Sequence, residues 1–306
     1  MKKEFPYIGT LIDINQFCDK YRVNKIDNVF LWIIYPFRKV KGILESLAIR
    51  KGFIGKIFTK VLITFKQFIK LFNFKFTVFT KQGHPILIYL SFDEQDFLAF
   101  YQALINEDYL APFDILEINS FVDAGANIGM ASLFFLLNTT NIESALLVEA
   151  NPKLIDRLTT NLDFFEDKQI IIENKLINGI SNQELQFYIS PMHRGSHIIR
   201  TAESQKTTSE AKTVTVKSVS LSDLLDKHAL EKVDLLKMDI EGAEFDILEN
   251  DIDVFKRFKY LCMELHGSVD ERNLFRDKIR TIGFKTYERK TSHPRVEIFF
   301  ASRLSV

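Results

Sequence analysis

The chain has 306 residues, and its 46% hydrophobic and 26% charged content is an ordinary balance for a globular protein. Its 40 basic and 40 acidic residues cancel, so no net charge favours binding to nucleic acid. Cys18 and Cys262 are too far apart for a disulfide framework or a zinc knuckle, and they predict a reducing compartment. No apolar stretch has the ~18 residues of a membrane span or the pattern of a signal peptide, so we expect a cytoplasmic protein.

The first 73 residues are predicted to form a basic, mainly helical region. Ten basic residues and one acidic residue lie between Arg38 and Lys75. Residues 54–72 place lysines on one side and aliphatic and aromatic residues on the other at helical spacing. Such a helix either packs on its own protein with the lysines in water or makes a peripheral contact with an anionic membrane, and both alternatives stay open. No nucleic-acid recognition module accompanies the lysines.

Two further elements are predicted before residue 120. Phe74–Thr80 and Pro85–Leu90 are apolar segments around a short glycine-containing turn, which indicates a β-hairpin. A helical pattern then covers Asp93–Ile105, with Asp93 or Ser91 as its N-cap.

From residue 120 onward, short apolar strands alternate with helical patterns, as expected for βα units on a parallel sheet. The predicted strands are 121–122, 145–148, 170–172, 233–238 and 260–263. The predicted helices are 128–137, 153–162, 221–225 and 244–250. We therefore expect three parts: a basic region (1–73), a hairpin and helix (74–119) and an α/β domain (120–306).

Two antiparallel pairs are predicted in addition to these strands. Residues 185–189 and 213–219 are expected to form a β-ribbon inserted before the fourth strand. Residues 284–287 and 296–301 are expected to pair at one edge of the sheet.

A glycine-rich turn follows the first strand of the α/β domain. It reads Asp123, Ala124, Gly125, Ala126, Asn127, Ile128 and Gly129. Glycine permits a sharp turn and close approach of a ligand, and the start of the following helix adds free N–H groups. Asp123 suits the ammonium group of an amino-acid moiety, directly or through water. Glu149, twenty residues after Gly129, suits the two hydroxyls of a ribose.

The turn lacks the G-x-G-x-x-G spacing that cradles a pyrophosphate. An acid directly before it suits a cationic ligand better than a phosphate. A nicotinamide-dependent oxidoreductase is therefore the less favoured alternative.

A second acidic motif ends the fourth strand, in the segment Lys237–Glu244. Asp239 and Glu241 are expected at the same carboxyl edge of the sheet as the glycine turn, where ligands of open α/β sheets bind. Glu241 and Glu244 could instead cap the following helix.

Three segments together resemble the FkbM-type methyltransferase family. They are Asp123–Gly129, Glu149–Pro152 and Lys237–Glu244, and Cys262–Gly267 resembles the end of that family's fifth strand. The resemblance implies a class I methyltransferase fold, Rossmann-like with a mostly parallel seven-stranded sheet flanked by helices. It also implies O-methylation, often of sugars or secondary metabolites. Ala150 departs from the family pattern but leaves Glu149 in place, and Lys175–Gly179 departs near a proposed adenine contact at Asn178.

The proton of an acceptor hydroxyl needs a base. His266 is the leading candidate because it follows the fifth strand and titrates near neutrality. Glu264, Asp239 and Glu241 are alternatives. These four side chains could also hold Mg²⁺ or another divalent ion, but no spacing specifies such a site, and no metal is predicted.

The motifs in this order thus predict an S-adenosylmethionine-dependent methyltransferase. The resemblance alone implies the acceptor, a hydroxyl oxygen of a saccharide or related metabolite, as a small molecule or in a glycan. The residues expected to bind S-adenosyl-L-methionine are Asp123, Gly125, Ala126, Asn127, Gly129, Glu149 and Asn178. The residues expected at the reacting groups are His266, Asp239 and Glu241. A non-catalytic, membrane-associated cofactor-binding protein stays open as an alternative of a different class.

Overall fold

A computed structural model describes residues 11–23, 73–79, 85–91, 94–189, 197–198, 212–289 and 296–303. The chain divides into two compact units, Met1–Glu107 and Asp108–Val306. The predicted amphipathic helix over 54–72 lies outside the described residues. Among the helices that are described, none is long and apolar enough to cross a membrane.

The first unit contains the predicted hairpin and helix. Its described elements are α1 (Leu11–Lys20), β1 (Asn73–Phe79), β2 (Pro85–Ser91), α4 (Glu94–Phe100) and a π-helical turn (Tyr101–Ile105). β1 and β2 pair antiparallel, with Asn73 opposite Ser91, which confirms the hairpin. Ser91 belongs to the strand and not to the helix cap, and Asp93 lies outside the described residues.

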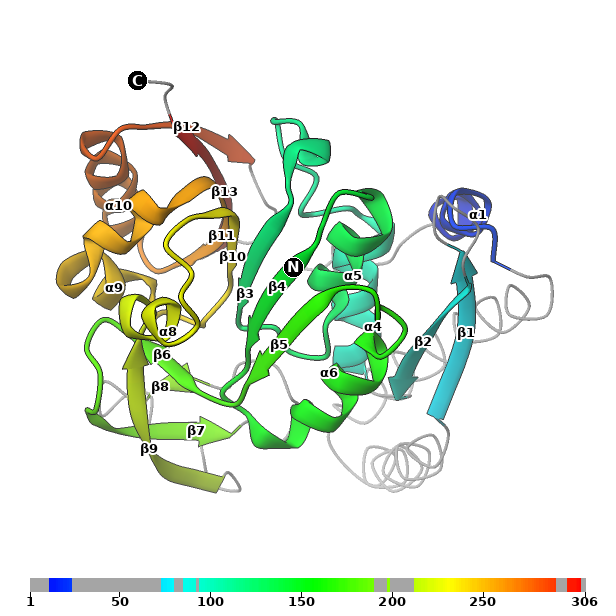
Figure 1. Ribbon diagram of the computed structural model, residues 1–306, viewed down its shortest axis with the longest axis horizontal. Helices are drawn as coiled ribbons and strands as arrows, with labels where there is room; N and C mark the ends of the chain where they lie inside the picture. Colours follow the sequence, from blue (N-terminus) through cyan, green and yellow to red (C-terminus); the bar gives the residue numbers. More distant parts are fainter. Residues whose placement is uncertain are drawn as a thin grey trace, which may run out of the picture. The chain divides into compact units, whose positions relative to one another are not determined.

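The second unit is built on a seven-stranded sheet of order β12-β13-β11-β10-β3-β4-β5 (Figure 1). Its strands are β3 (Ser120–Ala124), β4 (Ser144–Val148), β5 (Gln169–Glu173), β10 (Val233–Met238), β11 (Phe258–His266), β12 (Phe284–Arg289) and β13 (Val296–Arg303). The first five are parallel, and β13 runs antiparallel to both of its neighbours. The mostly parallel seven-stranded sheet is confirmed.

Helices cover both faces of this sheet, as Figure 1 shows. On one face lie α5 (Met130–Asn138) and α6 (Ile155–Leu162), and on the other α8 (Leu221–Lys227), α9 (Glu244–Asn250) and α10 (Val269–Thr281). Strands buried on both faces have continuous apolar runs, which is why β3, β4 and β10 are recognisable from sequence. Leu236 and Phe275 are fully buried in the core between the sheet and the second group of helices.

Helix α10 is absent from the elements predicted above. Its N-terminus is marked by a capping box, in which the Ser268 side chain accepts from the Glu271 amide and the Glu271 carboxylate accepts from the Ser268 amide. Ser-x-x-Glu is a helix-start signal that the sequence carries openly. The apolar periodicity after it is weak, because Glu271 is followed by mostly polar residues.

The inserted ribbon is also confirmed and is larger than predicted. Strands β7 (Glu184–Ile189) and β9 (Lys212–Ser220) pair antiparallel. They belong to a second sheet that also contains β6 (Leu176–Asn178) and β8 (His197–Ile198). Short 3-10 turns of the second unit lie at Ile115–Glu117, Pro152–Leu154 and Ile252–Arg257.

Candidate functional site

The glycine turn joins β3 to α5 at the carboxyl edge of the sheet. Gly125 has a φ of 79°, and a Cβ atom there would lie 1.8 Å from the carbonyl oxygen of Asp239. That contact is with the backbone and cannot be relieved by a side-chain movement. Gly125 is therefore needed because the strand end of β10 passes directly against the turn, in addition to any ligand.

The N–H groups at the front of the turn are already bonded. The amides of Gly125 and Ala126 both donate to the carbonyl of Val148, at 2.9 and 3.0 Å. The amide of Asn127 donates to Oε2 of Glu149 at 2.8 Å. The end of β4 thus supplies acceptors for all three amides, which precede the start of helix α5 at Met130. The turn is correspondingly poor as a cradle for a phosphate.

Glu149 follows β4 and is 8% exposed. Its Oε1 atom accepts from the amide of Asn151 at 2.7 Å, while Oε2 accepts from Asn127. Burial raises the pKa of this carboxyl above its usual range, although the two backbone hydrogen bonds act in the opposite direction. Each carboxylate oxygen has capacity for a further donor, so both could accept ribose hydroxyls.

Asp123 lies beneath the turn and is fully buried. Its Oδ1 atom is 2.9 Å from Nζ of Lys237, and its Oδ2 atom accepts from the Ser132 hydroxyl at 2.6 Å. A carboxylate with no exposed surface and a lysine partner has little left to offer a ligand ammonium group. This placement disfavours the predicted direct contact and makes Asp123 a support for the turn.

Lys237 is a site residue whose role the sequence motifs do not predict. Besides Asp123, its ammonium group donates to the carbonyl of Gly125 at 2.8 Å and lies 5.7 Å from the centre of the Tyr109 ring. Burial alone would lower its pKa, but the charges of Asp123, Asp239 and Glu264 outweigh burial and raise it. A lysine inside an apolar strand is the sequence signal that could have indicated this role. A lysine buried in such a strand needs a partner for its charge.

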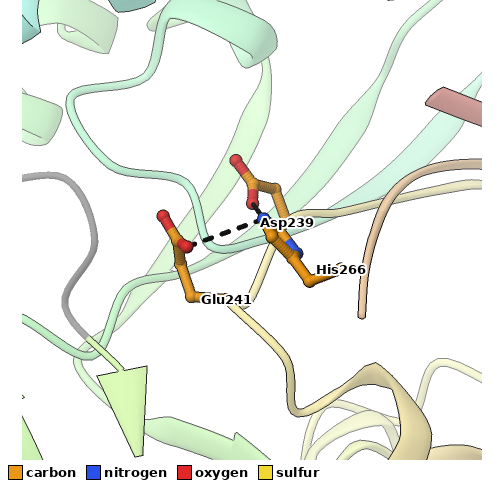
Figure 2. A group of neighbouring side chains, drawn as sticks. All are labelled: Asp239, Glu241 and His266. Atoms are coloured by element: carbon orange, nitrogen blue, oxygen red, sulfur yellow. Dashed lines mark ion pairs between the residues drawn. The ribbon is translucent and has the colours of Figure 1, made fainter. Parts of the chain in front are cut away.

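A second polar cluster lies where β10 and β11 end. Figure 2 shows Asp239 and Glu241, which follow β10, pointing toward His266 at the end of β11. The Nε2 atom of His266 is 3.8 Å from Oδ1 of Asp239 and 3.6 Å from Oε2 of Glu241. The three residues expected at the reacting groups are thus brought together at the predicted edge.

His266 is held from behind by Glu244, which is fully buried in the first turn of α9. Its Nδ1 atom lies 3.1 Å from Oε1 of Glu244, and the same oxygen accepts from the amide of Ile240 at 3.3 Å. Burial by itself would lower the pKa of His266, but the carboxylates of Glu244, Asp239 and Glu241 raise it to about 10. An imidazolium cannot accept a proton, which favours a carboxylate as the base in this arrangement.

Two other predicted residues lie apart from this cluster. Glu264, an alternative base, accepts from the Tyr109 hydroxyl at 3.1 Å and is not among the three residues that could share one ion. Asn178 ends β6 and donates to the side chain of Gln183 at 3.0 Å. Its Oδ1 atom is buried and accepts no hydrogen bond from the described residues.

The chain matches the model of a known protein family over more than half of its length. The model described as "Methyltransferase FkbM domain" matches residues 123–302. A 153-residue stretch is 26% identical to the hexuronic acid methyltransferase AglP of Haloferax volcanii and covers 50% of this chain and 58% of that protein. The chain therefore spans less than two thirds of that relative.

Solved structures of methyltransferases are similar to this chain at low sequence identity. A methyltransferase FkbM from Methylobacillus flagellatus is 17% identical, with 66% of this chain and 47% of that chain covered and a TM-score of 0.44. Fibrillarin of Aeropyrum pernix, solved with S-adenosyl-L-methionine, is 10% identical, with 74% and 93% covered and a TM-score of 0.41. Neither similarity is close enough to indicate a substrate.

Proposed function

Since the chain belongs to the FkbM methyltransferase family, with the class I methyltransferase fold, we propose that it transfers the methyl group of S-adenosyl-L-methionine to a hydroxyl oxygen of a saccharide or related metabolite. One observation carries the choice of cofactor. The carboxylate of Glu149 accepts a hydrogen bond from the amide of Asn127, so the acid and the glycine turn form one hydrogen-bonded unit, the Glu149 unit, at the edge of β3 and β4.

The residues of this unit fit a nucleoside with a cationic, amino-acid-bearing chain. Glu149 would accept the ribose hydroxyls, and the turn from Gly125 to Gly129, with Ala126 and Asn127, would line the chain that carries the sulfonium. Asn178 offers a buried Oδ1 atom to an amino group such as that of adenine. When bound, S-adenosyl-L-methionine supplies an electrophilic methyl carbon and leaves as a neutral thioether.

The cluster of Asp239, Glu241 and His266 would face the acceptor. Methyl transfer from sulfur to oxygen is an in-line displacement, so placing the acceptor accounts for much of the rate. A carboxylate of the cluster would take the hydroxyl proton as the new C–O bond forms. His266 would hold the two carboxylates in place, since its Nδ1 atom is fixed by Glu244.

Calorimetric titration tests the cofactor. We expect saturable binding of S-adenosyl-L-methionine and S-adenosylhomocysteine, and loss of both in Glu149→Ala. Glu143→Ala, which removes an exposed acid at the opposite end of β4, is the matched control and should bind normally. Binding of NAD alone would favour the oxidoreductase, and binding of no nucleotide would overturn the proposal.

The acceptor proposal draws on the relative named for hexuronic acids, and it needs its own test. Transfer of a labelled methyl group to hexuronic acid and to neutral sugar glycosides should be compared. A hexuronic acid offers both hydroxyls and a carboxylate, so the product should be treated with alkali. A methyl ether survives alkali and supports the proposal. Release of methanol would identify an ester and contradict methylation of a hydroxyl.

A further inference from the structure

We propose that Asp239, Glu241 and His266 bind a divalent cation that accepts both carboxylate oxygen and imidazole nitrogen, such as Mn²⁺. Each residue offers one ligand atom, and these atoms all lie within 4.8 Å of one another. Figure 2 shows the three side chains converging from the ends of two neighbouring parallel strands, β10 and β11. Glu264, the fourth side chain considered from the sequence, binds Tyr109 instead.

The separations within the cluster suit ligands better than hydrogen-bond partners. Nε2 of His266 is 3.8 Å from Asp239 and 3.6 Å from Glu241, both beyond normal hydrogen-bond length. Two neighbouring ligand atoms that each lie about 2.1 Å from an ion in an octahedral site are about 3.0 Å apart. Binding an ion would therefore require these two separations to shorten by roughly 0.6–0.8 Å, which side-chain rotation can supply.

The contact behind His266 is the one that a metal-binding imidazole needs. A ligating histidine donates the N–H of its other nitrogen to a carboxylate or a carbonyl, and this contact fixes the tautomer and the ring. Here Nδ1 lies 3.1 Å from Oε1 of the fully buried Glu244. An incoming ion would displace the proton on Nε2 and release it to solvent. With its remaining proton on Nδ1, the imidazole would then direct the Nε2 lone pair toward Asp239 and Glu241.

Two buried oxygens supply an independent indication. Oδ1 of Asp239 and Oε2 of Glu244 are shielded from solvent and accept no hydrogen bond from any described residue. Both belong to carboxylates that approach His266. Buried carboxylate oxygens without donors are costly, and a cation in the cluster would compensate the negative charge that three carboxylates leave around one imidazole.

The donor set also indicates which cation is preferred. Carboxylates suit Mg²⁺, Ca²⁺ and Mn²⁺, whereas imidazole suits later transition metals, so a mixed set favours Mn²⁺ over Ca²⁺. The Asp239 and Glu241 side chains are 17% and 31% exposed, which leaves coordination positions for water or an acceptor oxygen. The role of the ion in the reaction rests on the proposed function: it would lower the pKa of an acceptor hydroxyl coordinated to it.

Titration of the whole, metal-stripped chain with Mn²⁺, followed by calorimetry and by the electron paramagnetic resonance of free Mn²⁺, tests the site without turnover. We expect one ion per chain. Asp239→Asn and His266→Gln should abolish binding, and Glu244→Ala should weaken it about 10–100-fold by removing the acceptor that fixes Nδ1 of the ring. Asp226→Asn, which removes a surface carboxylate paired with Arg257, is the control and should bind as the wild type does.

The far-ultraviolet circular dichroism spectrum and a cooperative thermal unfolding transition report that each variant is folded, whether or not it binds S-adenosylhomocysteine. Equal Mn²⁺ affinity in the wild type and in a folded Asp239→Asn variant would overturn the site. So would the absence of binding by the wild type at millimolar Mn²⁺. If Mn²⁺ binds in the pattern expected but neither sulfur nucleotide binds the wild type, the site stands and the proposed function fails.

Discussion

The Nζ atom of Lys237 lies 2.9 Å from Oδ1 of Asp123, and the two side chains are 3% and 0% exposed. The residues are direct partners in the register of β10 and β3. Lys237 also donates to the carbonyl of Gly125. The ion pair therefore connects β10, which leads to Asp239, with the glycine turn. The two parts of the candidate site thus share one buried support.

Removing one member of this pair should destabilise the protein. Lys237→Met leaves the Asp123 carboxylate buried without its cation, and such a change costs about 3–5 kcal/mol. Asp123→Asn should have a cost of similar size, and the double variant should lose less than the sum of the two. Urea denaturation measures all three. Additive losses would show that the two charges do not depend on each other.

Gly125→Ala should abolish nucleotide binding and lower stability strongly. The new Cβ atom would lie 1.8 Å from a backbone oxygen, so the turn or the end of β10 must move, at a cost of about 3 kcal/mol or more. Gly283→Ala is the matched control, because Gly283 also has positive φ but no atom of the residues that the structure describes lies within 4 Å of the position that a Cβ would take. That variant should lose only the ~1–2 kcal/mol of left-handed strain. Thermal and urea unfolding measure both losses, and losses of similar size in the two variants would contradict the backbone clash.

Cofactor affinity should decline on mild acidification. Burial raises the pKa of Glu149, so its carboxylate takes up a proton at a higher pH than an ordinary glutamate does. Protonation removes the negative charge and part of the acceptor capacity offered to the ribose. Affinity is then full above the raised pKa and is lost as the pH falls through it. The same shift means that ionised Glu149 costs the folded state free energy, so its contribution to stability declines as the pH rises through that pKa.

Calorimetry of S-adenosylhomocysteine binding from about pH 5 to 8 checks this dependence. Glu149→Gln should bind weakly and should show a flatter profile than the wild type. An equally steep profile in Glu149→Gln would assign the titration to another group.

Asn178→Ala should weaken S-adenosyl-L-methionine binding about tenfold. One good hydrogen bond to a buried acceptor contributes about 1.4 kcal/mol, which corresponds to a factor of about ten in affinity. The reason is the buried Oδ1 atom that accepts no hydrogen bond from the described residues. Asn250→Ala, which removes a side-chain contact to the carbonyl of Asp246 on α9, should leave the affinity unchanged. Unchanged affinity in Asn178→Ala as well would remove this residue from the adenine site.

Much of the fold is predictable because it depends on local patterns. Strands buried on both faces require continuous apolar runs, so the predicted strands Ala145–Val148 and Val233–Met238 lie within one residue of their observed bounds. Parallel strands expose their carboxyl ends at one edge, so the order of motifs is enough to assign Glu149 and Asp239 to the same edge. Helix α10 was not predicted, although Ser268 and Glu271 mark its start.

Local motifs are sufficient to predict the α/β sheet, the glycine turn and the acid that follows β4. They are also sufficient to predict the family to which the chain belongs. What each acid does depends on tertiary contacts. Asp123 pairs with Lys237, Glu264 with Tyr109, and Glu244 with His266, whereas Asp239 and Glu241 converge on the imidazole. Motif spacing gives the strand and the edge from which a carboxylate emerges. Its charge partner comes from a distant part of the chain, and burial beside that partner decides whether the carboxylate supports the fold or faces a ligand.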